Sequence, residues 1–514
     1  IFVRRVVKDN IGHGVSIVLK SICKSDGKLR FHNVYSSMVS SAITVGFGGS
    51  VGLEAPMVLT GSAIGSNLAR FFHLKPKQTT LLLACGSTAA MAAIFKAPIA
   101  AIVFTFEVLM LDLTGSAILP LLLSAATGTV MSMLFLGRNV MFSIGSTQEF
   151  WISNIPFYII LGLLTGLLSA YFLRLSRWVE KQMRKIRQPY MRAVFGGLLL
   201  SGLIYLFPVF YGEGYENINV LINGDYTSLF ANSPLRMFGS SVWIMFAGVA
   251  GIVLLKVFAT SLTTSAGGIG GVFAPTLFIG AFTGFFVAGV SNNLLGTHLP
   301  YVNFILAGMA GVMTGVMQAP MTAMFLIAEL SGGYTLLIPL MITAACSYLS
   351  VFPFEKYSVY TKPLADKGNL KTHNKNKFAL RKLQWDQFID TDIKTVPAHS
   401  TLRTYVDIIA KSKRNLFVVI NEQNVFQGLL VMDDHRDVIF NQELYDLVRV
   451  EDLMIEPEEF IYEDDTGAVV LEKFKNTGNF NMPIITHDRH YIGFLSRAKF
   501  LTKYQAFVAE ESDD

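Results

Sequence analysis

The chain has 514 residues, of which 52% are hydrophobic and only 15% are charged, whereas a soluble globular protein carries about 25% charged residues. The charge is also uneven, because 35 charged residues fall in positions 1–362 and 44 fall in the much shorter stretch 363–514. This composition excludes an ordinary soluble protein and favours a membrane domain followed by a soluble one. The net charge of +5 arises in the first part, where it indicates loops that face the cytoplasm rather than nucleic-acid binding.

Neither the cysteines nor the start of the chain indicates an exported protein. Cys23, Cys85 and Cys346 stand singly in apolar surroundings, and their spacing predicts neither a disulfide framework nor a metal site. The residues that follow Ile1 carry charges without an apolar stretch, so we expect no signal peptide in this sequence.

Long apolar segments follow one another from about residue 37 to residue 353, and several are interrupted by Gly and Pro. Such interruptions are typical of transporters and channels, in which broken helices direct their ends toward a site near the middle of the membrane. The sequence therefore predicts an α-helical, polytopic membrane domain built from broken helices. The expected segments are 79–111, 116–137, 156–173, 193–212, 241–262, 271–295, 302–330 and 334–353.

The membrane part contains an internal repeat. Residues 81–109 and 304–332 align without gaps, keep an Ala-Pro step in register, and pair Glu107 with Glu329. Two helices rich in small residues can resemble each other by composition alone. The repeat is inferred because the Ala-Pro step and the Glu stay in register over the whole window. The repeat predicts two related halves, with the substrate at the place where they meet.

Each repeat follows a glycine-rich element that opens a helix, GGSVGLEAP at 48–56 and GGIGGVFAP at 267–275. Proline suits the first helical turn, and the free N–H groups around it point out of the helix end. Two opposed helix N-termini bind an anion without a fixed positive charge, and a weak site of this kind favours conduction. The expected amide donors are those of Leu53, Glu54, Ala55, Gly271, Val272 and Phe273.

Glu54 is the most informative acidic residue in the sequence, because it lies among apolar residues at one of these helix starts. A carboxylate inside a membrane is costly and indicates a function. At this position it can occupy the anion site itself, and it can leave when it is protonated. We therefore predict that Glu54 is a proton-sensitive gate, with simple helix capping as the alternative.

The C-terminal part contains a second duplication. After a polar stretch that is typical of a linker, residues 417–434 and 482–499 each predict a strand, a polar turn, a second strand and a helix start. Helical patterns at 401–412 and 466–475 precede them. The expected structure is two small α/β modules of about 60 residues each.

These elements resemble the CLC family of chloride channels and anion/proton exchangers. GLEAP resembles the family's G-x-E-G-P element, GGVFAP matches G-G-x-F-x-P, and GHGVS at 12–16 takes the place of G-S-G-I-P. The tail resembles the paired CBS modules found with this family. The resemblance implies a CLC-like fold with inverted repeats at 1–362, lacking the first helices of the family, and a tandem CBS domain of α/β type. The implied boundaries are a linker at 363–382 and CBS modules at 383–450 and 451–510.

Carried over by position, the resemblance implies a central anion site formed by the amides of Val272 and Phe273, the hydroxyl of Tyr357 and the residue at His13. The outer site would use the amides around Glu54. His13 replaces the family's serine, and its ring N–H is a different donor that titrates near neutral pH. Ala55 replaces a glycine and should stiffen the turn after the gate.

The position of the family's inner proton-transfer glutamate is taken by Val108, one residue after Glu107. A step of one residue rotates a helical side chain by about 100°, so we expect Glu107 to face elsewhere and to share a structural role with Glu329. Valine cannot relay a proton. The sequence therefore favours a channel or a weakly coupled transporter, with a proton-coupled anion antiporter as the alternative.

In the CBS modules, the family's nucleotide element G-h-h-S/T-x-x-D is incomplete in both copies. The first copy keeps Asp434 and the second keeps Ser496, so adenine-nucleotide binding is a secondary hypothesis and no cofactor is required. The resemblance further implies a homodimer in a lipid bilayer, in the cell (inner) membrane, with chloride or similar anions and protons as ligands. The tail and the basic run at 174–187 would then face the cytoplasm.

The sequence disfavours two other classes of CBS-containing membrane protein. An intramembrane metalloprotease needs a His-Glu-x-x-His helix, and none of the nine histidines is followed by Glu. A divalent-cation transporter needs several carboxylates in the membrane, but the apolar core offers few. We therefore expect a transport protein and not an enzyme.

Overall fold

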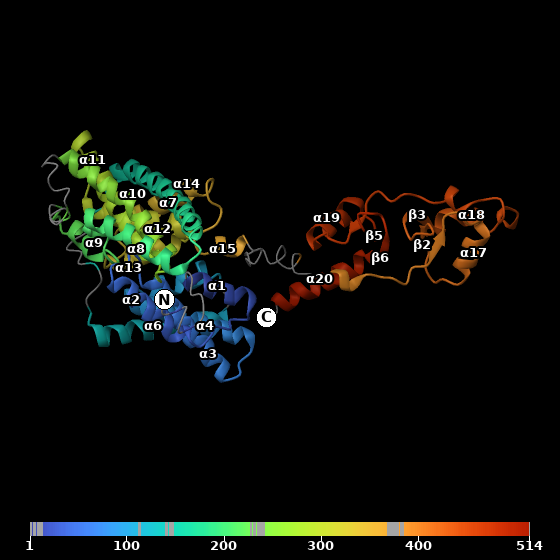
Figure 1. Cartoon of the computed structure of the whole chain (residues 1–514), viewed down its shortest axis with the longest axis horizontal. Helices are drawn as coiled ribbons and strands as arrows, with labels where there is room; N and C mark the ends of the chain where they lie inside the picture. The colour runs from blue at the N-terminus through green and yellow to red at the C-terminus, as the bar shows by residue number, and fades with distance from the viewer. Residues whose placement is uncertain are drawn as a thin grey trace. The chain divides into compact units, whose positions relative to one another are not determined.

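The computed structural model describes residues 3, 7, 14–111, 115–138, 142, 149–226, 229, 233, 242–366, 380 and 385–512. The chain forms two compact units, Ile1–Leu370 and Lys371–Asp514. The first unit is helical and the second contains both helices and strands, as Figure 1 shows.

The described part of the first unit is helical. Among the described residues, six stretches are long and apolar enough to cross a membrane, as expected from the apolar segments. These are α4 (Pro76–Phe95), α6 (Gly115–Leu136), Ile152–Arg184, which joins η2 (Ile152–Asn154) to α7 (Ile155–Arg184), α8 (Pro189–Leu206), α10 (Val242–Ala266) and α11 (Phe273–Leu295). The remaining elements are α1 (Gly14–Lys24), α2 (Asn33–Gly46), α3 (Glu54–Phe71), α5 (Pro98–Glu107), η3 (Pro208–Phe210), α9 (Tyr215–Ile222), α12 (Tyr301–Met317), α13 (Pro320–Leu330), α14 (Leu337–Val351) and α15 (Lys362–Ala365).

The internal repeat appears as two sets of three helices, α3–α4–α5 and α11–α12–α13. In each set the first two helices pack backbone to backbone at a pair of glycines. A Cβ atom added at Gly86 would meet the carbonyl oxygen of Gly61, and one added at Gly308 would meet that of Gly280. Gly86 and Gly308 are partners in the sequence repeat, so the repeat fixes the same close helix contact twice.

The two halves also exchange carboxylates. Glu107, at the end of α5, accepts hydrogen bonds from the amides of Met321 at 3.1 Å and Thr322 at 2.7 Å, and from the Thr322 hydroxyl at 2.7 Å. Glu329 on α13 accepts from the amides of Ile99 at 3.1 Å and Ala100 at 2.8 Å. Each carboxylate therefore satisfies the free N–H groups at the start of the short helix in the other half.

The second unit contains two sheets of the same topology. In each, a parallel pair is followed by an antiparallel hairpin, with strand order β1-β2-β3 and β4-β5-β6. A helix lies between the first and second strand of each sheet, α17 (Leu402–Ala410) and α19 (Gly467–Thr477). The predicted tandem α/β modules are confirmed. The strands are β1 (Thr395–Pro397), β2 (Leu416–Ile420), β3 (Phe426–Val431), β4 (Ile461–Tyr462), β5 (Asn481–Ile485) and β6 (Tyr491–Ser496), and the other elements are η6 (Trp385–Phe388), η7 (Met432–His435), α18 (Arg436–Ile439), η8 (Gln442–Leu444), η9 (Val450–Asp452) and α20 (Arg497–Ser512).

The two modules pack against each other through their hairpins. Val418 and Phe426 of the first module share a buried apolar cluster with Ile485 and Phe494 of the second. The amide of Phe426 also donates to the carbonyl of Arg489 at 2.8 Å. The modules therefore form one domain, because each sheet leaves an apolar face that only the other covers.

Candidate functional site

The two glycine-rich elements meet at a pair of glycines. The amide of Gly52 donates to the carbonyl of Gly271 at 2.9 Å, and the amide of Gly271 donates to the carbonyl of Gly52 at 2.7 Å. Helix α3 begins two residues after Gly52, and α11 begins two residues after Gly271. The structure therefore brings two helix N-termini to one place, and unpaired amides at such ends attract an anion.

The side chain of Glu54 lies at this junction and is 1% exposed. The hydroxyl of Tyr215 donates a hydrogen bond to Oε1, and the backbone amide regions of Glu54 itself and of Ala274 lie close to the carboxylate. Across the part of the chain that the structure describes, no group donates a hydrogen bond to Oε2. The carboxylate thus stands where the two helix ends would hold an anion.

A third segment, which sequence reasoning missed, closes this site. The amide of Leu53 donates to Oε1 of Glu213 at 2.9 Å, and Tyr215, which contacts Glu54, begins α9 two residues later. Lys256 on α10 is fully buried and attracts the Glu213 carboxylate. A lone Lys in the apolar segment 241–262 was the available sequence signal, because buried charges inside membranes are rare and functional.

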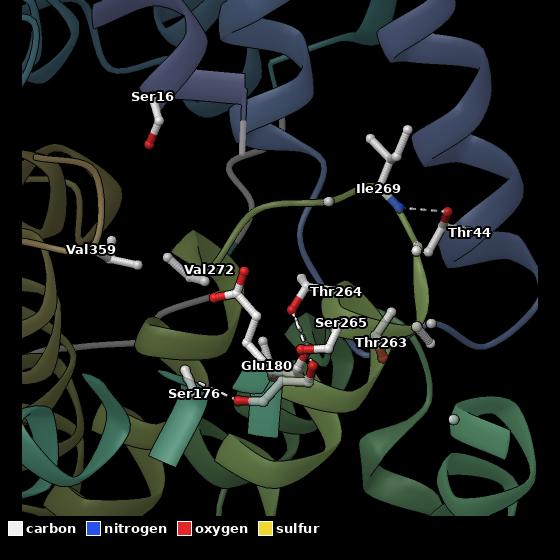
Figure 2. A pocket seen from close by; sticks show the side chains of 18 of the residues that line it. Ser16, Thr44, Ser176, Glu180, Thr263, Thr264, Ser265, Ile269, Val272 and Val359 are labelled. Atoms are coloured by element: carbon white, nitrogen blue, oxygen red, sulfur yellow. Dashed lines mark hydrogen bonds between the residues drawn. The ribbon is translucent and has the colours of Figure 1, made fainter. Parts of the chain in front are cut away.

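A cavity of about 1780 Å³ opens beside the second glycine-rich element, which contributes Ile269, Gly270 and Val272 to its wall. Figure 2 shows Ser16, Val359 and Val272 around the same space. Among the described residues, six basic side chains line the cavity against three acidic ones, so it favours small anions. The basic residues are Lys20, Arg177, Lys181, Arg184, Arg192 and Lys362, and the acidic residues are Glu180, Glu355 and Asp366.

The family model described as voltage gated chloride channel matches residues 1–351, and the CBS domain model matches residues 450–505. The first match covers more than half of the chain. This chain belongs to the voltage gated chloride channel family. CLC-type chloride transport is therefore its general activity, and it is a membrane protein.

Known proteins similar to this CLC chain support the same family. A ClcB-like protein of Ralstonia nicotianae is 29% identical over 358 residues, which cover 68% of this chain and 79% of the relative. The voltage-gated ClC-type chloride channel ClcB of an Escherichia coli strain is 28% identical over 66% of this chain and 78% of its own length.

Two solved structures share the CLC fold. A slow cyanobacterial Cl⁻/H⁺ antiporter has a TM-score of 0.59 at 22% identity, covering 71% of this chain and 83% of its own. A CLC-type fluoride/proton antiporter has a TM-score of 0.57 at 25% identity, covering 70% and 84%.

The structure places two neighbouring tyrosines of this CLC chain differently. Tyr357 is 36% exposed, lines the cavity, and has the Lys362 ammonium 5.5 Å from its ring centre. Tyr360 is instead 1% exposed, its hydroxyl makes no hydrogen bond with any described residue, and the Glu54 charge acts on it. A tight turn, closed by the Lys362 amide donating to the carbonyl of Ser358 at 3.0 Å, directs the two tyrosines differently. Tyr360 is therefore a second candidate for the site, and the role of Tyr357 stays a prediction.

The two other departures from the family pattern have different outcomes. His13 lies outside the described residues, and its role stays a prediction. Ala55 is 1% exposed and fills the space between two glycines. A Cβ atom added at Gly271 would lie 2.8 Å from the Ala55 methyl, and one added at Gly14 would meet its carbonyl oxygen. The methyl group of Ala55 therefore packs against the second glycine-rich element.

The structure places Val108 in the membrane unit and the two candidate nucleotide-binding residues, Asp434 and Ser496, in the second unit. Val108 is 4% exposed and belongs to the main apolar core, while neighbouring Glu107 is held at the start of α13. Asp434 is exposed on η7, and Ser496 is the last residue of β6. Nucleotide binding therefore stays a prediction that rests on Asp434 and Ser496 in separate modules.

Proposed function

We propose that this chain is a chloride transporter of the CLC type whose outer gate is Glu54, and that its transport is channel-like or only weakly coupled to protons. The observation that carries the proposal is the Glu54 carboxylate, buried where the helix ends after Gly52 and Gly271 meet. A carboxylate there is itself a bound anion, so chloride and Glu54 compete for the same amides.

The pathway follows from the same geometry. An anion collects in the basic cavity, reaches the amides of Val272 and Phe273 with the hydroxyl of Tyr360 nearby, and leaves when the Glu54 side chain moves away. Hydrogen bonds from amides and a hydroxyl hold an anion weakly enough for release. Protonation neutralises Glu54 and favours its departure, so flux should rise as the outer pH falls.

Val108 supports weak coupling. It is buried among apolar side chains, and a proton that moves from the cytoplasm to Glu54 needs a polar carrier in that layer. Glu107 is a poor substitute, because three hydrogen bonds to α13 hold its carboxylate. Chloride should therefore move with little stoichiometric proton movement.

A proton-coupled antiporter is the second candidate. It is favoured by the fluoride/proton antiporter among the similar structures and by the retained carboxylate at Glu54. In that case protons reach Glu54 through water or through His13 rather than through the Val108 position.

Purified full-length protein in liposomes separates the two candidates when chloride efflux and internal pH are measured together. We expect efflux with little net proton movement, and Glu54→Gln should retain flux but lose its pH dependence, because an amide does not titrate. Glu216 is an exposed carboxylate on α9. Glu216→Gln is therefore the matched control. Uphill proton uptake driven by chloride and abolished by Glu54→Gln would establish the antiporter, and undiminished pH dependence in that variant would remove Glu54 as the gate.

The assembly and the placement of the protein are part of the same proposal. We propose a homodimer in the cell (inner) membrane with the CBS domain in the cytoplasm, because the basic run at 174–187 favours that side. Cross-linking in membranes and protease access to the tail in vesicles of known orientation test these two points.

A further inference from the structure

Lys256 is a buried charge that the gating scheme above does not use. It lies within α10, its side chain is fully buried, and its Nζ donates no hydrogen bond to any described residue. The centre of the Phe278 ring is 4.6 Å from Nζ, and a Cβ atom added at Gly214 would lie 3.6 Å from Nζ. The carboxylate of Glu213, the residue before Gly214, attracts the ammonium group. An ammonium group in this setting is held by electrostatic attraction alone, which is costly inside a membrane.

Glu213 connects this lysine to the outer anion site. Its Oε1 accepts from the amide of Leu53 at 2.9 Å, and this amide is one of those expected to hold an anion. The Glu213 carboxylate is attracted by Lys256 and repelled by Glu54. The Glu213 carboxylate therefore occupies an amide that could otherwise bind a free anion. The positive charge of Lys256 offsets its negative charge.

The offsetting charges of Lys256 and Glu213 affect how tightly the site would hold an anion during transport. Without Glu213, the buried ammonium would add a full positive charge to a site that otherwise holds anions with dipoles alone, and conduction requires weak binding. In a low-dielectric interior the added attraction is large. Glu213 cancels it while leaving the peptide amides in place.

We propose that Lys256 is the cationic component of the outer anion site and that Glu213 neutralises it, so that this pair sets how tightly the site holds a small anion. The proposal rests on the proposed anion pathway, but it does not depend on Glu54 being the gate.

The test measures chloride binding to the purified full-length protein by calorimetry, together with chloride efflux from liposomes. Glu213→Gln keeps an oxygen that can accept from the Leu53 amide but removes the charge. We expect chloride to bind about tenfold more tightly and efflux at saturating chloride to slow, because release becomes limiting. Glu213→Gln combined with Lys256→Met should return both values to within about twofold of the parent.

Controls separate this proposal from gating. Glu216→Gln, on the exposed side of α9, should leave both measurements unchanged. The same variants are repeated with Glu54→Gln, because removing Glu213 also relieves repulsion on Glu54. Tighter binding that persists without Glu54 supports the proposal even where gating by Glu54 fails its own test. Unchanged or weaker binding in Glu213→Gln, or tighter binding that the added Lys256→Met does not reverse, would overturn it.

Discussion

The two glycine-rich elements have the same backbone arrangement, but each carries a different side chain at its helix start. In the repeat, Gly52 corresponds to Gly271 and Glu54 corresponds to Phe273. The first position holds a carboxylate that accepts a hydrogen bond from Tyr215, whereas Phe273 packs against the ring of Phe95 with centres 5.3 Å apart. The two helix starts therefore share their backbone arrangement and differ in one side chain, which is an ionisable carboxylate in the first and a packed aromatic ring in the second.

The largest effect on transport should come from adding a methyl group to each glycine of the central pair. In Gly52→Ala the new Cβ overlaps the Glu54 carboxylate, so we expect the gate to be displaced and the pH-dependent change in efflux to fall by about tenfold. In Gly271→Ala the new Cβ lies 2.8 Å from the Ala55 methyl, so stability should fall while pH dependence remains. Efflux at several pH values and thermal unfolding measure both. Equal effects of the two variants on pH dependence would contradict the asymmetry.

The two carboxylates that contact the opposite half, Glu107 and Glu329, should differ in how much they contribute to stability. Glu107→Gln and Glu329→Gln each weaken hydrogen bonds at the helix start in the other half, and we expect each to lower stability by about 2 kcal/mol. Glu107 accepts three such bonds and Glu329 two, so Glu107→Gln should be the more destabilising. Unfolding of the purified protein in detergent measures this. A loss of proton coupling in Glu107→Gln without a loss of stability would give Glu107 a transport role instead.

A smaller effect should distinguish the two tyrosines near the end of the membrane unit. Removing the buried hydroxyl in Tyr360→Phe should weaken chloride binding about threefold, the loss of one weak hydrogen bond. Tyr357→Phe, on the exposed ring, should change it little. Chloride titration by calorimetry makes the comparison. The reverse order would restore Tyr357 to the central site.

The smallest effect should come from His13, which replaces the family's serine. Its imidazole N–H can donate to an anion and titrates near neutral pH, so His13→Ser should raise the preference for chloride over larger anions by about twofold. It should also shift any activation near pH 7. Permeability ratios measured in bilayers check the change. Identical ratios would mean that the His13 side chain faces away from the pathway.

The sequence was informative where function is carried by contiguous residues. The repeat, the helix starts at Glu54 and Phe273 and the paired CBS modules could be predicted, because glycine, proline and apolar periodicity act over a few residues. The contacts of Glu54 could not, since Tyr215 and the Glu213 partner of Leu53 are 161 and 160 positions away from the residues that they contact.

The sequence could not distinguish between neighbouring tyrosines for a different reason. A motif position predicts that a tyrosine is near the site, but a turn decides which one points inward. Tyr357 and Tyr360 are three residues apart, and the turn at Ser358 sends one to the cavity and the other into the core. The orientation of that turn depends on a contact far away in the sequence, because the amide of Val359 donates a hydrogen bond to the carbonyl of Val316 on α12.

The exchange of Glu107 and Glu329 also constrains how the protein is made. The start of α5 receives its carboxylate from a residue 229 positions later in the chain. At ordinary rates of synthesis this is a delay on the order of ten to fifty seconds. Until then the N–H groups of Ile99 and Ala100 lack the carboxylate that they contact in the folded protein, so the native packing of the first half is completed only after the second half has been made.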